Sequence, residues 1–165
     1  MAGLFHDFIV LSRKDHDYQD YMKLINYPEA LQVHDDIIHY IGDSLMWITC
    51  YSPGHKEMVK LKGLNLYGPT IIKKDGAETA WRIFRAWADL FACGPYELEL
   101  TGSYVVTEGD EDAGSDCRVA AVDSGSYEKI RIVRDALVEQ MSALASYCYE
   151  VIEGDDDVYL LHLGI

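Results

Sequence analysis

The side chains that could do chemistry are spread along this sequence without a recognisable catalytic spacing. A serine or cysteine nucleophile needs a base nearby, yet the sequence holds no Gly-x-Ser-x-Gly turn and no cysteine in a known enzyme signature. Among six histidines only His34 and His39 are close neighbours, and five helical residues separate side chains by about 140°. We therefore expect surface or half-buried histidines, with His162 on the polar face of a strand. No catalytic residue, metal site or cofactor is predicted.

The cysteines are widely spaced, unlike the ligands of a zinc ribbon or the bridges of a small disulfide framework. Each one lies among apolar neighbours in the sequence, which favours buried, reduced thiols. They are Cys50, Cys93, Cys117 and Cys148.

Acidic side chains are the strongest signal, because nine of them gather in two short segments. Removing these nine charges from the formal charge of −14 leaves only −5 for the rest of the chain. Clustered carboxylates are also calcium ligands, but neither segment has the spacing of an EF-hand loop. Solvated loops and a partner-binding surface are the other two interpretations. The residues are Glu108, Asp110, Glu111, Asp112, Asp116, Glu153, Asp155, Asp156 and Asp157.

Two weaker patterns leave an enzyme or a small-molecule-binding domain open as an alternative. Glu97 and Glu99 lie on one face of a predicted strand, as a general acid and base would, although no sugar-binding cleft is indicated. Trp47, Tyr67 and Trp87 are candidates to line an apolar pocket.

Length and composition predict one soluble globular domain over residues 1–165. No apolar run is long enough to span a bilayer, and the N-terminal residues lack the features of a secretory signal, so we expect a cytoplasmic protein. The acidic balance disfavours nucleic acid and anionic membranes as partners.

The first half of the sequence predicts short elements. Residues 5–11 are rich in strand formers, and apolar residues then recur at helical spacing in 18–25 and again in 28–41, where Gly42 ends the stripe. Residues 45–51 predict a strand. Residues 64–72, interrupted by Gly-Pro, predict two extended pieces around a turn.

The second half holds the clearest helix, residues 76–93, with Asp75 as an Asp-led capping box. A hairpin of strands 96–107 and 117–122 follows, with the first acidic segment at its tip. A long helix with apolar residues from Ile130 to Val151 comes next, although Glu128–Val133 could instead extend the hairpin. Residues 158–163 predict a last strand.

This order of elements predicts an α+β fold with helices packed on a mainly antiparallel sheet. In size, acidity and element pattern the chain resembles small acidic bacterial immunity proteins, which neutralise a cognate secreted toxin. The resemblance implies a one-to-one inhibitor whose carboxylates cover the basic cleft of a protein toxin. An acidic mimic of nucleic acid is a further alternative, and it would need carboxylates at phosphate-like spacing over one face.

Overall fold

The computed structural model describes residues 4–12, 18–53, 57–107 and 121–165. Eight strands and five helices are present in these stretches. The strands are β1 (Phe5–Ser12), β2 (Leu31–His34), β3 (Thr49–Pro53), β4 (Met58–Lys62), β5 (Pro69–Ile72), β6 (Glu97–Thr107), β7 (Ala121–Val133) and β8 (Val158–Leu163). The helices are α1 (Tyr18–Met22), α2 (Asp35–Tyr40), α3 (Gly42–Leu45), α4 (Lys74–Ala92) and α5 (Arg134–Glu153).

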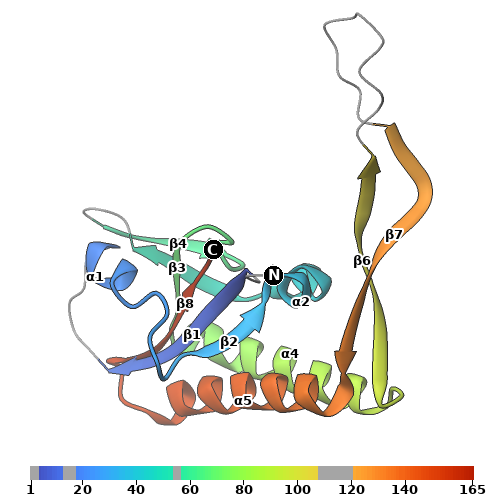
Figure 1. Cartoon of the computed structure of the whole chain (residues 1–165). Coiled ribbons are helices and arrows are strands. Elements are labelled where there is room, and N and C mark those ends of the chain that lie inside the picture. Colours follow the sequence, from blue (N-terminus) through green and yellow to red (C-terminus); the bar gives the residue numbers. More distant parts are fainter. Residues whose placement is uncertain (1–3, 13–17, 54–56, 108–120) are drawn as a thin grey trace, which may run out of the picture.

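Six strands form one sheet in the order β2-β1-β8-β5-β3-β4, and every neighbouring pair is antiparallel. The last strand, β8, lies between β1 and β5 in the middle of the sheet (Figure 1). From Tyr159 to Leu163 every residue of β8 is buried, because both faces of the sheet are covered there. The α+β expectation is confirmed.

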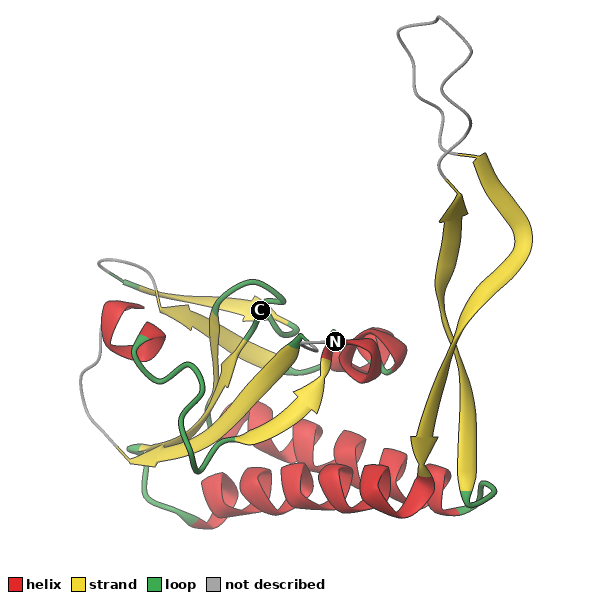
Figure 2. Ribbon diagram, viewed as in Figure 1, coloured by secondary structure: helices red, strands yellow, loops and turns green. Residues whose placement is uncertain are grey.

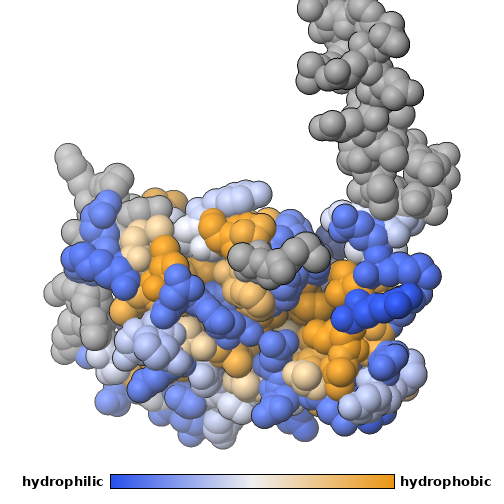
Figure 3. Space-filling view, in the orientation of Figure 1, coloured by the Kyte–Doolittle hydropathy of each residue, from blue (hydrophilic) through white to orange (hydrophobic). Residues whose placement is uncertain are grey.

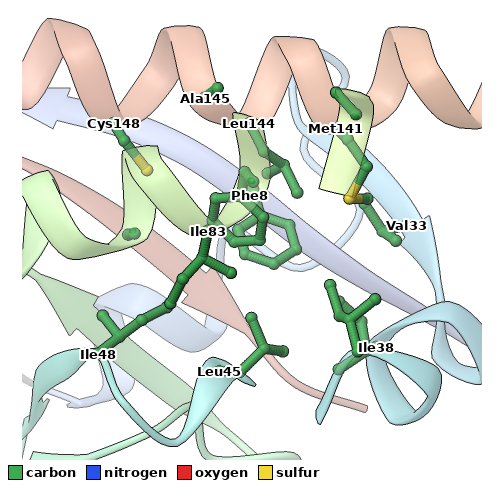
Figure 4. Close-up of a cluster of buried hydrophobic side chains, with 14 of the residues drawn as sticks. Phe8, Val33, Ile38, Leu45, Ile48, Ile83, Met141, Leu144, Ala145 and Cys148 are labelled. Carbon is green, nitrogen blue, oxygen red and sulfur yellow. The ribbon is translucent and has the colours of Figure 1, made fainter. Parts of the chain in front are cut away.

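The long helices α4 and α5 lie side by side against one face of the sheet (Figure 2). Phe8 of β1 is fully buried beneath them and lies among side chains from α2, α4 and α5 (Figure 4). A smaller apolar cluster on the opposite face joins Tyr21 of α1 to Ile9, Ile71 and Leu161 of the sheet. Burying a large apolar side chain contributes about 1.5–3 kcal/mol, so these two clusters hold the layers together.

Strands β6 and β7 form a separate two-stranded sheet that projects away from this body (Figure 1). We call the β6–β7 hairpin the arm, and its first five residue pairs, from Glu97↔Val133 to Thr101↔Lys129, the root of the arm. Leu98 and Leu100 of the root are buried in the main core. The register then shifts twice between Thr101 and Val106.

Several predicted boundaries are wrong in the first half of the chain. A single helix over 28–41 was expected, but residues 31–34 pair with β1 as β2, and α2 begins only at Asp35. The side chain of His34 caps α2 by accepting a hydrogen bond from the backbone N–H of Asp36. Val33 in β2 and Ile37 in α2 are both buried in the core. Their four-residue spacing therefore matched that of a single amphipathic helix.

The strand expected over 45–51 is also displaced, because Gly42–Leu45 forms α3 and β3 starts at Thr49. Of the two extended pieces expected in 64–72, only β5 (Pro69–Ile72) is a strand. The edge strand β4 was not predicted. Its residues are mostly exposed and include Lys60 and Lys62, as is common where a sheet edge must resist further pairing.

The second half follows the predictions more closely. Helix α4 is confirmed, but Lys73 stands at its N-cap without a side-chain bond. Asp75 instead accepts hydrogen bonds from Tyr51 (2.7 Å) and Lys60 (2.9 Å). Residues 128–133 extend the hairpin, which was the alternative left open, and α5 starts at Arg134. Strand β8 has the predicted bounds.

Candidate partner-binding site

The second acidic segment forms the turn between α5 and β8, which we call the acidic turn (residues 153–157). Asp155 and Asp156 are exposed, and Asp156 forms a long ion pair of 3.3 Å with Lys74. Glu153 ends α5, whose last turn contains no basic residue. Carboxylates at the C-terminal end of a helix oppose the helix dipole, so their placement does not serve the stability of α5.

The first acidic segment, with Glu108, Asp110, Glu111, Asp112 and Asp116, lies outside the described residues. The strands on either side of it are described, and they pair up to Thr107↔Ala121. These paired ends lie at the far end of the arm, away from the body (Figure 1). The chain therefore enters and leaves this segment at the end of a projecting ribbon.

The root of the arm, whose strands lead to the first segment, is separated from the acidic turn by helix α5. The arm continues into α5 at Arg134, whereas the acidic turn follows the other end of the same helix. A helix of 20 residues is about 30 Å long. The root of the arm and the acidic turn therefore flank opposite ends of α5.

The root of the arm has one apolar face and one charged face. Glu99 accepts a hydrogen bond from Lys129 (2.6 Å) and lies 3.4 Å from Arg131. The bond from Lys129 lowers the pKa of the Glu99 carboxyl. A carboxylate held in its ionised form is poorly suited to act as a general acid, which weakens the Glu97–Glu99 interpretation.

Beyond its root the arm is a ribbon of two strands, and the described residues add no third strand to it. A two-stranded hairpin is only marginally stable in water, and its free edges expose backbone N–H and C=O groups. Such edges are suited to strand addition, in which a partner's backbone completes the pairing. The arm is therefore the element best placed for contact with another chain.

Two histidines contradict the expectation of a surface position. His6 and His162 are fully buried, and the Nδ1 of His6 lies 2.8 Å from the Nε2 of His162. His6 Nε2–H donates to Asp35 at 2.8 Å, so its Nδ1 accepts from His162. His162 Nδ1 is then buried without a partner among the described residues. Strand alternation places His6 with Phe8 and His162 with Leu160, a pattern that is compatible with burial but does not establish it.

Burial lowers the pKa of both rings. For His6 the desolvation outweighs the opposing hydrogen bond to Asp35. For His162 desolvation, helped by the neighbouring His6, holds the pKa well below its ordinary value. The two rings therefore form a neutral, buried pair that connects β1 and β8 to α2.

The cysteines agree with the expectation only in part. Cys50 and Cys148 are buried free thiols, and burial raises the pKa of Cys50 to about 12. Burial likewise raises the pKa of Cys148. Cys93 is exposed, which is a correction, and Cys117 lies outside the described residues.

The aromatic residues proposed for a small-molecule pocket do not converge. The exposed fractions of Trp47 and Tyr67 are 66% and 72%, so both stand out from the surface. Trp87 stacks on Phe91 and donates its indole N–H to Ser44. On the face shown in Figure 3, apolar areas are separated by hydrophilic residues.

Within the described stretches, no three His, Cys, Asp or Glu side chains gather closely enough to hold a metal ion. None of the described helices has the length and apolar character to cross a bilayer. Comparison of this chain with protein-family models, with curated proteins and with solved structures finds no match.

Proposed function

We propose that this chain is a cytoplasmic immunity protein that binds a cognate protein toxin and covers its basic active site. The observation that carries the proposal is the arm, a projecting ribbon with unpaired edges (Figure 1). It connects directly to five carboxylates in the sequence between Thr107 and Ala121. Backbone pairing along the ribbon would fix the partner, and the carboxylates would meet the lysine and arginine side chains of its active site.

The acidic turn is a second candidate contact. Because it flanks the opposite end of α5 from the root of the arm, we assign the first contact to the arm. The same separation weighs against a nucleic-acid mimic, which needs its carboxylates on one continuous face. A net charge of −14 also favours a cationic protein over nucleic acid or an anionic membrane.

The test uses the full chain as bait in an extract of its native host, compared with the variant Asp110→Lys, Glu111→Lys and Asp112→Lys. The wild-type chain should capture a basic protein, and purified chain should abolish the toxicity of that protein. The variant should associate at least about tenfold more slowly at low salt, with a flatter dependence on ionic strength. Equal association of both chains, or a captured protein without toxicity, would overturn the proposal.

A further inference from the structure

A groove between α4 and α5 opens on the side of these helices that faces solvent. Its volume is about 470 Å³, within the range of about 300–1,000 Å³ for ligand pockets. Ala88 and Ala145 are buried and allow the helices to approach closely, so the groove has a small-residue floor. Its other lining residues are Trp81, Arg85, Asp89, Ser142, Ser146, Tyr149 and Glu150.

One end of the groove is built from two aromatic rings. Trp81 of α4 and Tyr149 of α5 have ring centroids 6.2 Å apart and planes inclined by 47°. The side chain of Tyr149 is about half exposed. The ring of Tyr149 is therefore open to a flat group that enters from solvent.

This aromatic end already accepts a guanidinium group from the chain itself. The Cζ atom of Arg85 lies 5.6 Å from the centroid of Trp81, a cation–π arrangement. Four-residue spacing predicts an ion pair between Arg85 and Asp89, just as Arg82 pairs with Glu78 at 2.7 Å. No such pair forms in the described part of the chain, so Arg85 leaves the Asp89 carboxylate uncompensated.

Carboxylates complete the groove. Glu150 follows Tyr149 at the aromatic end, and Asp89 lies two helical turns from Trp81, about 12 Å away along α4. Among the described residues neither carboxylate has a hydrogen bond or ion pair. The hydroxyl of Ser146 donates to the Ser142 carbonyl, which leaves its oxygen free to accept.

We propose that this groove binds an arginine side chain from a protein partner. The guanidinium would lie against the solvent-facing sides of Trp81 and Tyr149, in the place that Arg85 takes on Trp81, and donate to Glu150, while its stem would cover the floor at Ala88 and Ala145. Arginine fits better than lysine because a planar guanidinium stacks on aromatic rings and donates to a carboxylate in the same plane. The inference rests on the proposed function only in that the partner is a cationic protein.

The test is an NMR titration of the ¹⁵N-labelled full chain with acetyl-Gly-Gly-Arg-Gly-Gly-amide. Its matched probe replaces arginine with citrulline, which keeps the shape but carries no charge. The arginine peptide should give saturable shifts at the Trp81 indole and at residues 145–150. The citrulline peptide should bind at least about threefold more weakly, since it loses the cation–π attraction.

Variants distinguish binding of the peptide in the groove from its general attraction to an acidic surface. Glu150→Gln should weaken binding of the arginine peptide at least about threefold, and Trp81→Leu should weaken it about fivefold. Arg85→Ala should strengthen binding about threefold, because Arg85 competes for the same ring. Glu57→Gln removes an equal charge from an exposed position outside the groove and should change nothing.

Three results would each overturn the inference. The first is a set of shifts that never saturate or that respond equally to Glu57→Gln and Glu150→Gln. The second is equal affinity for the arginine and citrulline peptides. The third is binding of free agmatine at least ten times tighter than the peptide, which would assign the groove to a small cation. None of these results depends on toxin capture, so failure of the proposed function is distinguished from failure at the groove.

Discussion

The buried pair of His6 and His162 is the most unusual contact at the scale of single residues. Asp35 fixes the direction of both hydrogen bonds, because a carboxylate can only accept. The chain of bonds ends at an Nδ1 atom that has no partner among the described residues. Burying this nitrogen without a hydrogen bond lowers the stability of the folded state by about 1–3 kcal/mol.

This pair predicts a loss of stability in mild acid. Both pKa values are lower in the folded protein than the ordinary value near 6.5, so below that pH the unfolded chain binds more protons. The free energy of unfolding should therefore fall as the pH drops through 6.5 towards the lower pKa values of the folded state. Urea unfolding at several pH values between 7.5 and 5 measures this free energy. In the variant His162→Leu the free energy of unfolding should depend less steeply on pH.

His39 provides the control for this prediction. Its side chain is about half exposed and lies 3.5 Å from the same Asp35 oxygen. The variant His39→Gln should keep most of the pH dependence, because the buried rings are unchanged. An unaltered slope in His162→Leu would contradict the assignment to the buried pair.

The burial of these histidines shows where sequence reasoning stops. Alternation along β1 places His6 on the same side as Phe8, and alternation along β8 places His162 with Leu160. Alternation does not show whether a face of the sheet is covered. Here α2 contributes to the cover through Asp35, which is 29 positions away from His6. A single polar residue in a short strand does not reveal it.

At the scale of elements, long amphipathic patterns were predictable and short ones were not. Helix α4 and strand β8 were correct because each repeats its pattern over its full length. Strand β2 is four residues long and is set by pairing with β1, so its local pattern was compatible with a helix. The arm and the acidic turn are separated by the length of α5. This helix begins at Arg134, four residues later than the apolar pattern that starts at Ile130.

The arm should be removable without unfolding the body. Replacing residues 103–127 with Asn-Gly keeps the root pairs and supplies a two-residue hairpin turn. The free energy of unfolding should change by less than about 1 kcal/mol, because an isolated ribbon adds little stability. Capture of the partner should be lost.

A core residue of the root provides the contrast. Leu100 is 9% exposed, and Leu100→Ala should lower the free energy of unfolding by about 2–5 kcal/mol. Urea unfolding of the two variants compares the outer ribbon with its root directly. A larger loss from arm shortening than from Leu100→Ala would show that the outer ribbon supports the fold.

The acidic turn predicts a gain in stability on neutralisation. Glu153→Gln with Asp155→Asn should raise the free energy of unfolding by about 0.3–1 kcal/mol at low salt, because both charges oppose the helix dipole. Asp135 lies in the first turn of the same helix, where a carboxylate is favourable. Asp135→Asn should therefore change stability in the opposite direction. Unfolding in urea at 20 mM and 300 mM salt checks both signs and their screening.

For the molecule as a whole, the charge of −14 acts on the free chain and on its complex in opposite ways. Salt screens repulsion between carboxylates, so 0.3 M sodium chloride should raise the melting temperature of the free chain by a few degrees. The same salt should slow association with a cationic partner. Scanning calorimetry and stopped-flow binding on one preparation give both quantities. Salt that changes neither the association rate nor the melting temperature would contradict this account.

The central position of β8 also governs the order of assembly. β1 and β2 form one half of the sheet, β3, β4 and β5 form the other, and β8 is the strand that joins them. Its partners in β1 lie about 150 residues earlier in the chain. The two halves can therefore be joined only after residue 163 has left the ribosome, which makes closure of the sheet a late, long-range step.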